Sequence, residues 1–260
     1  MNGPIGIFDS GVGGTSIWKE VHQMLPNERT IYLADSKNAP YGEKPKEAIL
    51  QLCIKNTEFL LGQGSKIIVV ACNTATTNAI DYLRSTYKVP FIGIEPAIKP
   101  AALHTKTKRI GVLATKGTLS SQLFHNTSKL HAQGIQIVEQ EGTGLVELIE
   151  AGKLESEEMG DLLYDYVKPM LKADIDCLVL GCTHYPYLIP ILRGLLPETV
   201  QIIDSGEAVA RRTKAILLKN KLQNTETGLK RKNQFYSNTD STVLKSLLGD
   251  GRHEIAYLDF

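Results

Sequence analysis

The sequence lacks several features that would place it in other classes of protein. No hydrophobic run is long enough to span a bilayer, and the N-terminus shows no basic-then-apolar signal peptide. Only four residues are cysteines, and none forms a C-x-x-C pair, which argues against a disulfide framework. The net charge is only +1, so neither a broad basic surface for nucleic acid nor an acidic disordered tail is expected. We therefore expect a cytoplasmic globular protein without a nucleic-acid or membrane partner.

What the sequence does contain is a regular alternation of apolar runs and amphipathic segments. Hydrophobic residues make up 42% of the 260, enough for a sizeable core. Short runs rich in Val and Ile predict strands buried on both faces of a parallel sheet. The predicted strands are 5–9, 30–34, 66–71 and 89–94 in the first half, and 110–115, 134–141, 177–180 and 200–203 in the second. The predicted helices are one ending near 25, then 45–62, 74–87, a start at 143–151, 155–171 and 207–219.

The order of these elements is strand–helix–strand–helix–strand–helix–strand, and it occurs twice. This repetition predicts an α/β fold of two pseudo-symmetric lobes with parallel sheets. Residues 221–233 are polar and predict a solvated loop, and 234–237 and 254–258 predict short closing strands.

Two cysteines, Cys72 and Cys182, each follow the third predicted strand of their half. Ligands of open parallel sheets bind beyond the carboxyl ends of the strands. Pseudo-symmetric lobes that face each other would bring both thiols to one cleft. Cys53 lies inside a predicted helix instead, and we interpret it as an inert buried thiol.

The glycine-rich segment 11–14 follows the first strand. It begins G-V-G-G-T-S, so the third glycine of the dinucleotide fingerprint G-x-G-x-x-G is absent. A strand-to-helix turn that presents backbone amides to an anion is the better interpretation. In the simplest alternative, Asp9 only caps the helix that follows.

Two thiols at strand ends admit several chemistries besides plain burial in a core. A zinc site would need a tighter Cys/His cluster, and a redox pair would need Cα atoms about 5–6 Å apart. A single nucleophile, Cys182 with His184 as base, remains an alternative. Acid–base chemistry uses both thiols: one removes a proton from one face of a carbon, and the other delivers a proton to the opposite face.

Four segments taken together, Phe8–Gly14, Asp35–Gly42, Ala71–Ala75 and Gly181–Pro186, resemble the glutamate racemases of the aspartate/glutamate racemase family. The resemblance extends from residue 5 to about 213. It implies Rossmann-like lobes with the active site between them, the first formed by 1–95 plus 206–260 and the second by 96–205. It also implies a homodimer that needs no cofactor or metal and interconverts L- and D-glutamate, supplying D-glutamate for peptidoglycan.

The resemblance also implies roles for particular residues. Cys72 would remove the α-proton of the D isomer and Cys182 that of the L isomer, assisted by Asp9 and His184. Glu150 matches a further acidic helper, although Glu147 is close by. The implied substrate contacts are Asp9, Ser10, Tyr41, Gly42, Asn73, Thr74, Thr115, Thr118, Thr183 and His184.

These motifs contain no arginine, so neutral donors and helix N-termini would hold the substrate carboxylates. Such donors do not by themselves distinguish glutamate from aspartate. Three alternatives therefore stay open: a racemase for another acid, a one-thiol decarboxylase or isomerase, and an amino-acid sensor that binds without turnover.

Overall fold

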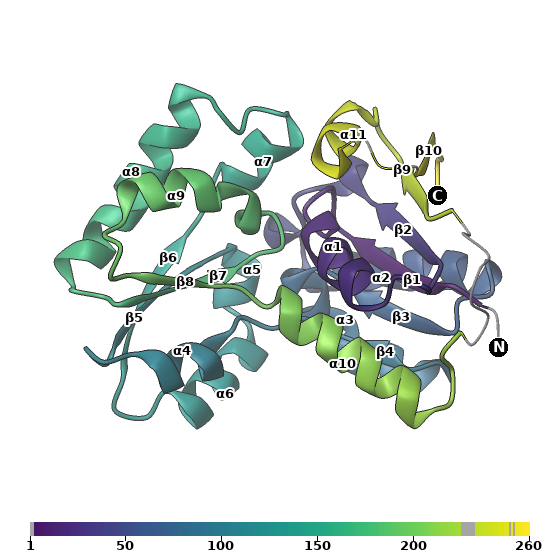
Figure 1. The fold of residues 1–260 in the computed structure, drawn as a ribbon, viewed down its shortest axis with the longest axis horizontal. Coiled ribbons are helices and arrows are strands. Elements are labelled where there is room, and N and C mark those ends of the chain that lie inside the picture. The colour runs from purple at the N-terminus through teal and green to yellow at the C-terminus, as the bar shows by residue number, and fades with distance from the viewer. Residues whose placement is uncertain (1–2, 225–231, 250, 252) are drawn as a thin grey trace.

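The structure is a computed structural model that describes residues 3–224, 232–249, 251 and 253–260. Its strands form two sheets, one in each of two lobes that lie side by side (Figure 1). The first sheet has the order β10 (Glu254–Tyr257), β9 (Gln234–Ser237), β2 (Thr30–Ala34), β1 (Ile5–Asp9), β3 (Ile67–Val70), β4 (Phe91–Ile92). The second has the order β6 (Gln136–Glu141), β5 (Arg109–Ala114), β7 (Cys177–Gly181), β8 (Gln201–Ile203).

The two sheets share one topology. All strand pairs are parallel, and the order β2-β1-β3-β4 in the first sheet corresponds to β6-β5-β7-β8 in the second. The predicted α/β fold with two parallel sheets is therefore confirmed. Every residue of β1, β3 and β7 is buried, which explains why these strands are unbroken aliphatic runs.

Helices flank each sheet. In the first lobe they are α1 (Thr15–Met24), α2 (Lys46–Gly62), α3 (Asn73–Thr86), α10 (Gly206–Lys219) and α11 (Thr242–Leu248), with 3₁₀ turns η1 (Ser36–Asn38) and η2 (Tyr41–Glu43). In the second they are α4 (Ile98–His104), α5 (Lys116–Leu119), α6 (Gln122–His131), α7 (Leu145–Glu150), α8 (Glu157–Lys172) and α9 (Ile189–Leu195), with η3 (Tyr185–Leu188). No helix within these described ranges is long and apolar enough to cross a membrane.

Several elements differ from the sequence prediction. Helices α4, α5, α6, α9 and α11 were not predicted, and the fourth strand is shortened to two residues. Helix α6 buries only Phe124, so it has little of the apolar periodicity on which prediction depends. Helix α7 begins two residues later than predicted, because Gly144 before it has a left-handed φ of 82° that few other residues adopt.

The end of the chain returns to the first lobe. The predicted strands β9 and β10 form there, with β9 paired in parallel to β2, and α10 packs against α1 (Figure 1). The predicted loop at 221–233 lies mostly outside the described residues. The Ser205 hydroxyl, just before α10, donates to the Glu95 carbonyl between β4 and α4 (2.5 Å). One cluster of buried apolar side chains also includes residues of both lobes, among them Ile7 of β1 and Leu180 of β7.

Candidate active site

A small cavity lies between the lobes, beyond the carboxyl ends of β1, β3 and β7. It leaves about 10 Å³ of free space, roughly enough for one water molecule. Both predicted thiols line it, so the structure brings Cys72 and Cys182 to one site. The other lining residues are Ser10, Pro40, Tyr41, Gly42, Asn73, Thr74, Thr115, Val146, Thr183 and His184.

Cys72 sits at the junction of β3 and α3. It is the N-cap residue of α3, and its Sγ accepts a hydrogen bond from the Ala75 amide (3.4 Å). The thiol also contacts the Ser10 hydroxyl at 3.6 Å. Burial, and then the nearby Asp9 carboxylate, raise the pKa of Cys72 well above its ordinary value, although the amide and Ser10 act in the opposite direction. Cys72 is therefore a protonated thiol at neutral pH.

Asp9 ends β1 and is completely buried next to this thiol. Its carboxylate accepts hydrogen bonds from the Gly14 amide (2.6 Å) and from the hydroxyls of Ser10 and Thr183 (both 3.4 Å). Burial raises the pKa of Asp9 from 3.8 to about 6, and the cationic form of His184 offsets part of this rise. Asp9 thus interacts with groups around both cysteines.

Cys182 follows β7 and has its own partners. Its Sγ lies 3.7 Å from Nδ1 of His184, and Nε2 of His184 lies 2.6 Å from Oε1 of Glu150. Burial alone would lower the pKa of His184, but hydrogen bonds with Cys182 and Glu150 raise it well above the ordinary value. An imidazolium at this position places a positive charge and an N–H group next to the Cys182 sulfur.

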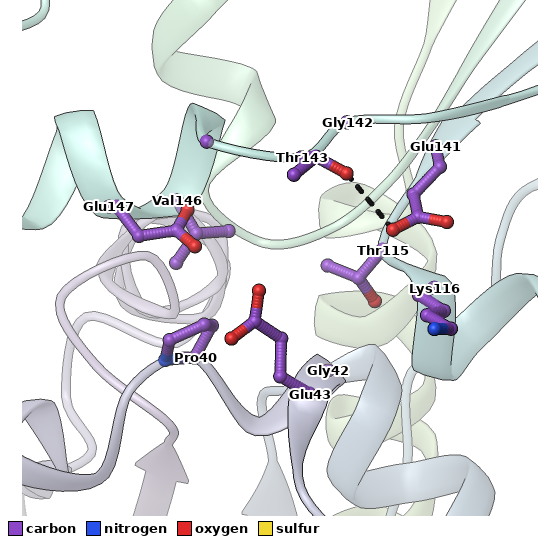
Figure 2. Close-up of a pocket in the computed structure, with 11 residues that line it drawn as sticks. Pro40, Gly42, Glu43, Thr115, Lys116, Glu141, Gly142, Thr143, Val146 and Glu147 are labelled. Atoms are coloured by element: carbon purple, nitrogen blue, oxygen red, sulfur yellow. Dashed lines mark hydrogen bonds between the residues drawn. The ribbon is translucent and has the colours of Figure 1, made fainter.

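The two candidate acids on α7 occupy different places. Glu150 meets His184, and it also accepts hydrogen bonds from the Val12 amide (2.7 Å) and the Ser36 hydroxyl (2.7 Å). Glu147 lines a second pocket just outside the cavity, into which Glu43 points from η2 (Figure 2). Only Glu150 of the two is thus in contact with the cysteine–histidine pair.

One polar side chain that faces the cavity has no protein partner in the described part of the chain, and a cluster of paired hydroxyls lies beside it. Among the described residues, the Asn73 amide group has neither a donor nor an acceptor for its two buried polar atoms. Next to it, the Thr74 hydroxyl lies 2.9 Å from that of Thr115 and 3.5 Å from that of Thr118, and the last two are 3.0 Å apart. Asn73 and Thr74 at the N-terminus of α3, with Thr115 of the other lobe beside them, can bind a small polar ligand that carries a carboxylate.

Tyr41 and Gly42 belong to the loop that closes one side of the cavity. The Tyr41 hydroxyl points away from a ligand, because it donates to the buried Asp35 carboxylate (2.5 Å). A Cβ on Gly42 would lie only 3.1 Å from Thr115 of the other lobe. A ligand in the cavity can therefore contact the backbone groups of this loop and the Tyr41 ring.

Sequence reasoning missed four residues of the site. Pro40 and Val146 line the cavity, Ser36 holds Glu150, and Tyr187 lies 2.6 Å from the Thr15 hydroxyl across the lobes. Pro40 and Ser36 stand inside a motif that the prediction quoted, but Tyr187 and Val146 carry no local signal. Across the described part of the chain, no group of three or more His, Cys, Asp or Glu side chains is arranged to hold a metal ion.

Solved structures with this fold define the class of protein. The Escherichia coli glutamate racemase, solved with L-glutamate and the activator UDP-MurNAc-ala, matches with a TM-score of 0.86 and 34% identity, covering 98% of this chain and 97% of that one. The Francisella tularensis glutamate racemase with D-glutamate gives a TM-score of 0.85 and 28% identity, covering 99% and 98%. The fold is that of glutamate racemases, and the chain is a racemase, which is an isomerase.

Sequence comparison gives the family. Residues 5–213 match the Asp/Glu/Hydantoin racemase model, and the chain belongs to that family. The glutamate racemase of Ectopseudomonas mendocina is 46% identical over 252 residues, covering 95% of both chains. That of Herpetosiphon aurantiacus is 47% identical over 224 residues, covering 86% of this chain and 88% of the other. The resemblance predicted from four short motifs is thus confirmed.

Proposed function

We propose that this racemase interconverts L- and D-glutamate by a two-base mechanism with Cys72 and Cys182. The observation that carries the proposal is that both thiols line one cavity between the lobes, each with a different set of partners. Relatives that are 46–47% identical and are called glutamate racemases support glutamate as the substrate.

The proton transfers follow from the two environments. With L-glutamate bound, the thiolate of Cys182 removes the α-proton, while the His184 imidazolium stabilises that thiolate beforehand. Cys72, whose pKa is raised by burial, starts as the thiol and donates its proton to the opposite face of the carbanion. The product is D-glutamate with a thiolate at Cys72 and a thiol at Cys182. The reverse reaction exchanges these roles.

Substrate binding has to offset the weak acidity of the α-proton. The free amide of Asn73 and the hydroxyls of Thr74 and Thr183 are neutral donors that can hold carboxylates through the reaction. The Asp9 carboxylate, when ionised, favours a substrate ammonium that stays protonated. These contacts stabilise the charge that develops on the carbanion, because they are in place before the proton moves.

The wider setting is part of the same proposal. D-glutamate made here would supply peptidoglycan synthesis, in the cytoplasm, where a reducing environment keeps both thiols free. We further propose a homodimer, for which exposed Leu103 on α4 and Leu130 on α6 are candidate contact residues. For the lobes we propose 1–95 with 206–260 and 96–205. The pairing of β9 with β2 and the packing of α10 on α1 support these boundaries.

The test is incubation of the purified protein with L-glutamate in D₂O, without added cofactor. Loss of optical rotation together with deuterium at the α-carbon is expected for wild type. Cys72→Ser and Cys182→Ser should each reduce turnover at least about 10³-fold, because each removes one of two required acid–base groups. Turnover that survives in either variant would contradict the two-base mechanism. A panel with aspartate and other acids would reveal a different substrate.

A further inference from the structure

The cavity is too small for its proposed substrate in this arrangement of the lobes. About 10 Å³ of free space holds one water molecule, whereas glutamate has ten non-hydrogen atoms. The lobes must therefore part to admit a ligand. Contacts that join the two lobes must break when they part and form again when they close.

The Glu150 side chain makes several of the contacts that join the two lobes. Its carboxylate comes from α7 in the second lobe, but two of its three partners, the Val12 amide and the Ser36 hydroxyl, belong to the first (2.7 Å each). The third partner, His184, lies in the same lobe as Glu150 at 2.6 Å. Opening the lobes thus removes two donors and leaves only His184.

The fit of the first lobe around this carboxylate is close. A Cβ on Gly11 would collide with the carboxylate of Glu150, and a Cβ on Gly13 would collide with the His184 ring. Both glycines belong to the turn after β1, so this turn is shaped to receive the Glu150–His184 pair. Glu150 does not line the substrate cavity, so it acts on the reaction through His184.

We propose that Ser36 is a positioning residue that, through Glu150, makes the state of His184 and Cys182 depend on closure of the lobes. This inference rests on the proposed racemisation. A carboxylate with one donor binds an imidazolium proton more strongly than a carboxylate shared among three donors. Closure therefore weakens the hold of Glu150 on the His184 proton, so His184 becomes a stronger proton donor toward Cys182 at the moment when substrate is enclosed.

Other charged or titratable groups also face His184. Cys182 contacts its Nδ1, and the Asp9 carboxylate of β1 acts on the same ring. Neither of these two groups depends on Ser36, so a change at Ser36 reaches His184 only through Glu150. The experiment can therefore separate the Ser36 contact from the rest of the site.

The test compares Ser36→Ala with Ser16→Ala. Ser16 also donates across the lobes, to the Thr183 carbonyl (2.8 Å), but it does not touch Glu150. Loss of a hydrogen bond to a charged group should raise KM about tenfold in Ser36→Ala. The basic limb of its kcat profile with L-glutamate should move up by roughly half a pH unit, because Glu150 then holds the imidazolium proton more tightly. Ser16→Ala should raise KM without moving that limb, and Ser36→Thr should restore both values.

Hydrogen exchange at the Val12 amide gives a readout that needs no turnover. This amide donates to Glu150, so its exchange should be about tenfold faster in Ser36→Ala than in wild type. Equal KM, pH profile and Val12 exchange in Ser36→Ala and wild type would overturn the assignment. A rise in KM with the same pH limb as Ser16→Ala would overturn it too. If wild type fails to racemise glutamate, the proposed function fails, while Val12 exchange still decides whether Ser36 holds the closed arrangement.

Discussion

Replacing Asp9 with asparagine should make the protein more stable at neutral pH. The Asp9 carboxyl is completely buried, and its pKa is raised from 3.8 to about 6. A shift of about 2 pH units corresponds to about 3 kcal/mol. The folded state therefore binds this proton more tightly than the unfolded state. The free energy of unfolding falls by about this amount as the pH rises from 4 to 6, and stays at the lower level above pH 6.

Asparagine has a similar shape and cannot ionise. Its side-chain oxygen can still accept the hydrogen bond from the Gly14 amide that the carboxylate accepts now at 2.6 Å. The difference in unfolding free energy, Asp9→Asn minus wild type, should therefore increase by up to about 3 kcal/mol between pH 4 and pH 7. Urea unfolding followed by circular dichroism at several pH values measures this difference directly.

A second carboxyl provides a control of opposite sign. Burial, the largest single influence, would raise the pKa of Asp176, but hydrogen bonds from Thr105, Lys106 and Thr107 together lower it to about 2. Asp176 therefore stabilises the fold above its ordinary pKa, and this contribution is lost as the pH falls toward 2. Asp176→Asn should become relatively less stable as the pH rises. A pH-independent difference for Asp9→Asn, beside a pH-dependent one for Asp176→Asn, would refute the reasoning about Asp9.

Three further changes test other features of the structure. Gly11→Ala should fold normally by circular dichroism but lose at least about tenfold in turnover, because the new Cβ collides with the Glu150 carboxylate. If the variant turns over as fast as wild type, the carboxylate moves aside. Lys66→Met leaves the buried Glu28 carboxylate without its 2.6 Å partner and should lower the free energy of unfolding, measured with denaturant, by about 3–5 kcal/mol. A decrease under about 1 kcal/mol would contradict this. Iodoacetamide at pH 7 should label Cys72 at least about tenfold more slowly than free cysteine, as measured by mass spectrometry, because burial raises the pKa of Cys72. Equal rates would contradict the raised pKa.

The sequence predicted those parts of the fold in which burial produces a recognisable pattern of apolar residues along the chain. Strands β3 and β7 are buried along their whole length, so their aliphatic runs stand out, and the cysteines after them mark the site. Helix α4 carried no such pattern, because it is seven residues long and has Pro100 in its first turn. Proline is tolerated there, but in a sequence it looks like the end of an element.

The site was predicted as a set of residues rather than as a set of contacts. Motifs placed Asp9 and His184 near the thiols and assigned Glu150 as a further helper, but they separated Glu150 only weakly from Glu147, which is close by on the same short helix. The choice depends on the direction of each side chain and on a partner in the other lobe, Ser36, which is 114 residues away in sequence. Contacts of that range are set by how the two lobes pack, and no local pattern records them.

The shared topology of the two sheets has a thermodynamic consequence. Each half of the chain offers its thiol on an equivalent scaffold, but Cys72 has Ser10 and Asp9 beside it and Cys182 has His184. Mirror-image substrates have equal free energies in water, so kcat/KM must be the same in both directions for this enzyme and for every variant of it. The unequal surroundings of the thiols can therefore make the two directions differ only in how each divides that common ratio between kcat and KM. A substitution beside one cysteine slows both directions. The enantiomer that becomes more tightly bound then shows on which side of the reaction the substitution acts.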